Sequence, residues 1–283
     1  MVLQNIIGSL LNLVNNSNIL GRVKAVFYKY LSDNYLYNII DMPNSSDILF
    51  HYGEFLFSSI IYDYGLSLTT NLLNKYSPPF KTLEDSRKKY VATNINKSIL
   101  LSLISGIFLK TVYSNPSLLK QNNDDISDYS KTIWKTTAVL YGSTDLVALI
   151  RDKTMSATTK THHYAVLLSL LIVLASDFKK GSLAKAIVIY GGFSSLALMV
   201  NFYLGSRFLF KRNGTTIKYI KKFSFYSYLL ACGLNWAWQG NYILHAYRGI
   251  FSNPMMLIKL ALNITMLYSW IKDDTILMRH LSQ

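Results

Sequence analysis

Seven long runs of apolar residues follow one another along the chain, and they constrain its fold more than any other feature. A helix needs about 17–25 mostly apolar residues to cross the hydrocarbon core of a bilayer. The segments between the runs are short and polar. We therefore expect an all-α, polytopic membrane helix bundle of about seven transmembrane helices, over residues 47–70, 97–113, 132–150, 163–177, 184–204, 223–246 and 254–271.

The composition supports a bilayer as the surroundings of these runs. Apolar residues make up 51% of the chain, charged residues only 16%, and the mean hydropathy is +0.21. A soluble domain carries about 25% charged residues. The net charge of +14 would suit a nucleic-acid partner only if it formed a basic stripe on a soluble face. The positive charges instead lie between the apolar runs, so membrane lipids rather than nucleic acid are the expected partners.

The loops between the runs differ in charge, and this difference predicts an orientation. Seven spans place loops 71–97, 151–162 and 205–222 and the carboxyl tail on one side, with 17 Lys and Arg, and leave 8 on the other. Cytoplasmic loops carry the excess of Lys and Arg. We therefore expect a lumenal amino terminus and a cytosolic carboxyl terminus. The sequons that begin at Asn15 and Asn44 would then face the lumen.

The same pattern divides the chain into four parts. Residues 1–46 lack the basic leader and cleavage site of a signal peptide, and are expected to form an interfacial, lumenal segment. Residues 47–84 hold the first span and a basic loop, interrupted by a Ser-Pro-Pro turn. Residues 85–275 form the six-helix membrane domain, and residues 276–283 form a cytosolic tail.

Ionisable side chains inside the apolar runs point to a site. An Asp, Lys or Arg at the centre of a span costs at least about 2.5–3.5 kcal/mol, so such residues face a cavity or a partner. With the predicted orientation, the polar residues of several spans fall in one layer of the cytosolic half: Asp63, Asn94, Asn96, Lys97, Asp145, His162, His163, Asn201 and Arg207. We therefore predict a cavity that opens toward the cytosol.

His162, His163 and Asp145 are the candidate catalytic residues in this layer. A histidine can accept or donate a proton near neutral pH, and a carboxylate can hold its ring and stabilise its charged form. Neighbouring side chains on a helix point about 100° apart, so one histidine of the pair is expected to face a given cavity. The alternative for Asp145 is an ion pair with Lys135 or Arg151.

Arg207, Asn201, Lys97 and Asp63 are the candidates for binding a lipid or its headgroup. An arginine at this depth suits a phosphate or carboxylate, and the alternative for Arg207 is an interfacial anchor. No metal site is expected, because two adjacent histidines without a further His or Cys one turn away are not a ligand set. His51 and Glu54, three positions apart, are expected to satisfy each other. The single cysteine, Cys232, is expected to be a packing residue.

Four segments resemble the TLC domain family, which includes ceramide synthases, translocon-associated TRAM proteins and lipid-homeostasis proteins. RKKYVATNINKSILLSLIS (87–105) is similar to the opening helix of that domain, and GFSSLALMVNFYLGSRFLF (192–210) to a later serine-containing helix. YGSTDLVALIRDKTMSATTKTHHYAVLLSLL (141–171) resembles its acidic residue, short basic loop and His-His pair. ALNITMLYSWIKDD (261–274) resembles its closing helix.

This resemblance implies a protein of the endoplasmic reticulum or another endomembrane, with His162, His163 and Asp145 as site residues. Ceramide synthases carry a further acidic cluster after the histidine pair, but the corresponding stretch here, IYGGFSSLALMVN, has no acid. We therefore expect a non-synthase member that binds or senses lipid acyl chains and influences membrane lipid composition.

Two other functions are left open by the sequence. One is an acyl-CoA-dependent N-acyltransferase with a histidine base, for which acyl-CoA is the co-substrate and a sphingoid base the acceptor. The other is a transporter or channel that uses the polar layer as its pathway. None of these functions requires a bound cofactor.

Overall fold

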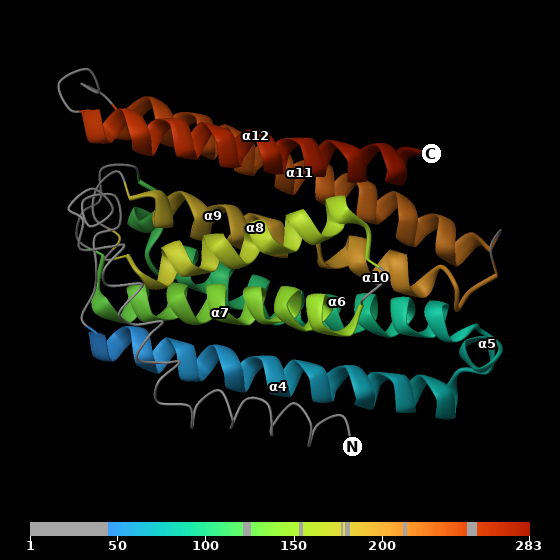
Figure 1. Ribbon diagram of the computed structural model, residues 1–283. Coiled ribbons are helices and arrows are strands. Elements are labelled where there is room, and N and C mark those ends of the chain that lie inside the picture. Colours follow the sequence, from blue (N-terminus) through green and yellow to red (C-terminus); the bar gives the residue numbers. More distant parts are fainter. Residues whose placement is uncertain are drawn as a thin grey trace. The chain divides into compact units, whose positions relative to one another are not determined.

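The computed structural model describes residues 45–120, 126–152, 155–176, 178, 182–211, 214–247 and 254–283, and these ranges contain helices and no β-strand (Figure 1). The all-α prediction is thereby confirmed for the described part of the chain. The segment expected at the membrane interface lies outside it, apart from its last two residues. The sequons at Asn15 and Asn44 lie outside it as well.

The helices fall on the predicted apolar runs. In chain order they are α4 (Ser45–Tyr76), α5 (Pro78–Lys81), α6 (Asp85–Ser114), the 3₁₀ turn η1 (Pro116–Leu119), α7 (Asp128–Arg151), α8 (Ala157–Leu174), α9 (Leu183–Ser195), α10 (Leu198–Ser206), α11 (Thr215–Ala246) and α12 (Pro254–Ser282). The fifth run is divided between α9 and α10, and α12 continues through the segment expected as a tail.

Local sequence signals account for several helix boundaries. α4 ends where the Ser-Pro-Pro turn begins, because Pro78 and Pro79 have no N–H to donate to a preceding turn and suit the start of a new helix. The hydroxyl of Ser127 accepts a hydrogen bond from the Ser130 N–H and caps α7. Ser156 caps α8 in the same way.

Helix length and apolarity separate the described helices into two groups. α6 is long and apolar enough to cross a membrane, the pair α9 and α10 qualifies if it counts as one span bent by 43°, and α8 is apolar but shorter. The other long helices carry polar side chains that lower their mean hydropathy, such as His51, Glu54 and Asp63 in α4. By this criterion one or two described helices qualify, fewer than the seven spans expected.

The helices pack side by side around α6 and α9. α6 contacts α4, α7, α9 and α10, and α11 contacts α9, α10 and α12. The largest apolar cluster joins these elements through aromatic side chains, including Phe108, Trp134, Phe178 and Trp270. The core therefore lies between α6, α7, α9 and α12.

Serine side chains from neighbouring helices bind the first turn of α10, just after its break from α9. Ser98 on α6 donates to the Leu198 carbonyl at 2.9 Å, and Ser224 on α11 donates to the Met199 carbonyl at 2.7 Å. These hydrogen bonds hold the start of α10 against α6 and α11. The bend places the end of α9 and the start of α10 on the wall of the cavity described below.

The basic loops predicted on one side gather at one end of the helices. Figure 1 shows α5, the start of α6, the α10–α11 connection and the carboxyl terminus at the same end. Described basic residues in these segments, at the end of α4 and at the start of α11 are Lys75, Lys81, Arg87, Lys88, Lys89, Arg207, Lys211, Lys218, Lys221, Lys222 and Arg279. Only the acids Glu84 and Asp85 accompany them within the described positions 75–89.

Candidate functional site

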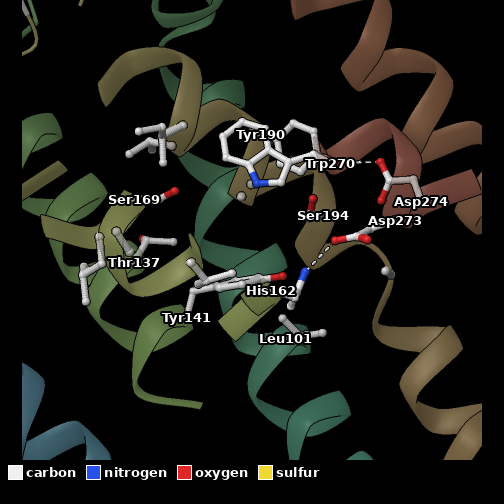
Figure 2. A pocket seen from close by; sticks show the side chains of 18 of the residues that line it. Leu101, Thr137, Tyr141, His162, Ser169, Tyr190, Ser194, Trp270, Asp273 and Asp274 are labelled. Carbon is white, nitrogen blue, oxygen red and sulfur yellow. Dashed lines mark hydrogen bonds and ion pairs between the residues drawn. The ribbon is translucent and has the colours of Figure 1, made fainter. Parts of the chain in front are cut away.

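A cavity of about 250 Å³ lies between α6, α7, α8, α9, α10, α11 and α12 (Figure 2). Much of its wall is apolar and comes from α6, α8 and α9: Leu101, Val166, Leu170, Val173, Ile187 and Val188. Its polar and aromatic lining is Lys97, Thr137, Tyr141, His162, Ser169, Tyr190, Ser194, Asn201, Tyr228, Trp270, Asp273 and Asp274. The cavity is therefore largely hydrophobic and has charged groups on part of its wall.

His162 is the histidine of the pair that lines this cavity. The Nδ1 atom of His162 lies 2.8 Å from Oδ2 of Asp273 on α12. Asp273 accepts the ring N–H when His162 is protonated at Nδ1, which leaves Nε2 as an acceptor. Figure 2 shows the His162–Asp273 contact beside Ser194 at the cavity edge. A histidine oriented by a carboxylate in this manner has the geometry of a general base.

His163 turns away from its neighbour and bonds a different carboxylate. The two imidazole rings are 5.6 Å apart at an angle of 77°. His163 Nδ1 hydrogen-bonds Oδ1 of Asp145, which is completely buried on α7. Lys97 Nζ lies 3.9 Å from the same oxygen, and the Thr144 hydroxyl donates to the other at 3.2 Å. Asp145 thus connects α6, α7 and α8 behind the cavity wall.

Asp63 belongs to a separate ion pair. Arg151 at the end of α7 donates to both carboxylate oxygens of Asp63 on α4, with Nη2 2.8 Å from Oδ2. The alternative pairing of Arg151 with Asp145 is therefore wrong. Asp63 does not line the cavity.

Arg207 also lies outside the cavity lining, at the carboxyl end of α10. Its Nη1 is 3.2 Å from Nε2 of His280, and its Nη2 donates to the Tyr90 hydroxyl at 3.3 Å. The guanidinium is also stacked against the rings of Tyr90 and Phe208. Of the headgroup candidates, Lys97 and Asn201 face the cavity, whereas Arg207 and Asp63 do not.

Sequence reasoning missed Asp273 and Asp274, the two acids that α12 contributes to the cavity. Asp274 accepts hydrogen bonds from the Tyr190 hydroxyl at 2.5 Å, the Tyr228 hydroxyl at 2.7 Å and the Trp236 indole at 3.2 Å. The predicted last span stopped at residue 271, which left both acids just beyond it and outside the predicted polar layer. The available signal was an Asp-Asp pair followed by apolar residues Ile276, Leu277 and Met278, which continues the helical pattern.

Two smaller expectations concern paired residues and metals. His51 and Glu54 do satisfy each other, with 2.7 Å between Nδ1 and Oε2. Within the described ranges, no group of three or more His, Cys, Asp or Glu side chains is arranged to hold a metal ion.

Comparison with known proteins gives no match to a family model, a curated protein or a solved structure. The resemblance to TLC proteins rests on the four segments quoted above.

Proposed function

We propose that the chain is a multi-span membrane protein of the TLC type, which holds a lipid acyl chain in the cavity between α6, α8 and α9. The proposal includes seven spans, an endomembrane location and a cytosolic basic end. Its parts are supported by different observations.

Rows of exposed apolar side chains support the membrane location. On α4, large apolar residues at three- or four-residue spacing are all exposed: Phe57, Ile61, Tyr64, Leu68 and Leu72. α11 has a similar row: Tyr219, Phe223, Tyr226, Leu230 and Leu234. Such spacing puts each row on one face of its helix. A continuous apolar face is unfavourable in water and favourable against lipid tails.

The cavity itself is the observation that carries the lipid-binding proposal. An acyl chain needs an apolar wall, and a lipid head needs polar groups at one edge. The wall from α8 and α9 supplies the first, and His162, Asp273 and Lys97 supply the second.

A cavity-filling substitution tests this proposal. Gly191 lines the cavity, and a Cβ atom placed there meets no atom within 4 Å. We expect Gly191→Leu to occupy the cavity without displacing the backbone and to reduce co-purifying lipid several-fold by mass spectrometry. Gly106→Leu is the matched control, because Gly106 is equally open but lies outside the lining. Equal lipid content in both variants would contradict lipid binding in this cavity.

A second candidate function, N-acyl transfer from acyl-CoA, is favoured by the His162–Asp273 pair. His162 would take a proton from the acceptor amine while the amine nitrogen attacks the thioester carbonyl. The C–N bond forms, the C–S bond breaks, and the proton passes to the departing thiolate of coenzyme A. Asp273 and Asp274 place two acids on the wall of the cavity that His162 also lines. Ceramide synthases carry a further acidic cluster after the histidine pair, and the corresponding stretch of this chain has none.

Cellular lipid profiles separate the two functions. Expression of the wild type, His162→Ala and Gly191→Leu would be followed by quantification of N-acyl lipids and phospholipid acyl chains. Acyl transfer predicts an N-acyl product that both variants lose. Lipid binding without chemistry predicts a phospholipid change that Gly191→Leu removes, with no N-acyl product from the wild type or either variant.

A further inference from the structure

The described part of the protein places no cation beside the buried carboxyl group of Asp274. The residue is 9% exposed, and the hydroxyls of Tyr190 and Tyr228 and the indole of Trp236, all neutral groups, donate hydrogen bonds to it. No described Lys, Arg or His nitrogen lies within 4.0 Å of its oxygens. Neutral donors satisfy a carboxylate's hydrogen bonds but leave its negative charge uncompensated.

The adjacent wall adds to this negative charge. Asp273 also lines the cavity, and its described ion-pair partner is His162. Lys97 is the lysine in the lining, and its ammonium already lies 3.9 Å from Asp145. The edge formed by α12 therefore favours a positively charged ligand.

Aromatic rings surround the same space. Figure 2 shows Tyr190 and Trp270 on one side of the cavity and Tyr141 on the opposite side, with Asp273 and Asp274 at one edge. The rings of Tyr190 and Trp270 pack together with centroids 4.2 Å apart. Aromatic faces near carboxylates attract cations, and quaternary ammonium groups are bound in sites of this composition.

We propose that this edge of the cavity binds the quaternary ammonium of a choline lipid. The rings of Tyr141, Tyr190 and Trp270 offer faces to a bound cation, and the carboxylates of Asp273 and Asp274 supply the opposite charge. A trimethylammonium group has no N–H and is bound by charge and ring surfaces of this kind.

This inference rests on the proposed lipid binding and names its headgroup. The purified protein would be equilibrated with equal amounts of phosphatidylcholine, phosphatidylethanolamine and phosphatidylglycerol that carry identical acyl chains. Native mass spectrometry then measures which lipid stays bound. We expect the choline lipid to be enriched by about tenfold, the scale of a desolvated cation–π and charge interaction.

Variants locate the preference within the site. Asp274→Asn keeps the size of the side chain and removes its charge, and Asp273→Asn does the same at a partly exposed position with fewer contacts. Both are expected to reduce the choline preference to about twofold or less. Asp128→Asn, at an exposed carboxylate on the first turn of α7, is the control and should preserve it. Melting curves of each variant show whether it is folded.

The outcomes distinguish the choline-headgroup inference from the acyl-chain binding on which it rests. Equal binding of the three lipids by the wild type, with loss of all three in Gly191→Leu, would overturn the headgroup inference and leave acyl-chain binding intact. Preference for phosphatidylethanolamine would overturn the quaternary ammonium assignment in favour of a primary amine. No retained lipid in the wild type would overturn both.

Discussion

His162 Nδ1 lies 2.8 Å from Asp273 Oδ2, so a carboxylate 111 positions away in the sequence orients the histidine at the cavity. The next residue, His163, bonds Asp145 on α7 instead. Two adjacent histidines thus contact carboxylates on different helices. The first pair borders open space, and the second is part of the buried packing between α6, α7 and α8.

The two histidines should therefore differ in their effect on stability. His162→Ala leaves Asp273 partly exposed and should change the unfolding free energy by no more than about 1 kcal/mol. His163→Ala leaves the completely buried Asp145 with Lys97, at 3.9 Å, as its remaining charged partner and should cost about 3 kcal/mol. Thermal unfolding in detergent, followed by tryptophan fluorescence, measures both. A similar loss in the two variants would contradict this division of roles.

The ion pair between Asp63 and Arg151 predicts a rescue by exchange. Asp63→Ala should destabilise the protein because it leaves Arg151 without its described carboxylate partner at the α4–α7 contact. A double-mutant cycle with Arg151→Ala should give a coupling energy of about 1–3 kcal/mol. The exchanged variant Asp63→Arg/Arg151→Asp should recover part of the loss. Simple additivity of the two alanine substitutions would show that the pair contributes nothing.

The positions of the helices followed from the sequence because apolar run length and turn chemistry are local signals. The seven runs therefore coincide with observed helices, and the Ser-Pro-Pro turn coincides with the junction of α4 and α5. Asp273 and Asp274 were not predicted as site residues, because their role depends on α12 continuing past residue 271 and contacting α8 and α9. Arg207 was placed by depth alone, and depth does not say which face of α10 it occupies. Its contacts with Tyr90 and His280 keep it away from the cavity.

A close approach of α9 to α6 makes Gly192 sensitive to a single added methyl group. A Cβ atom at Gly192 would lie 2.3 Å from the ring of Phe108, which is buried in the main cluster. We expect Gly192→Ala to cost about 1–3 kcal/mol, the usual range for overpacking. The neighbouring Gly191→Ala should be tolerated, since nothing lies within 4 Å there. Partial recovery in Gly192→Ala/Phe108→Leu, read from melting temperatures, would attribute the loss to this contact.

The gathering of basic residues at one end of the helices predicts the sidedness of the protein. In a Cys232→Ser background, Lys89→Cys at the start of α6 should react with a membrane-impermeant maleimide in sealed microsomes. Lys120→Cys, just beyond the opposite end of α6, should react only after the membrane is permeabilised. Both lysines are exposed, so accessibility of the side chain itself is matched. The reverse labelling pattern would place the basic end in the lumen, against the charge rule for cytoplasmic loops. Labelling of both in sealed vesicles would mean that α6 does not cross the bilayer, which would contradict the multi-span proposal at its most apolar helix.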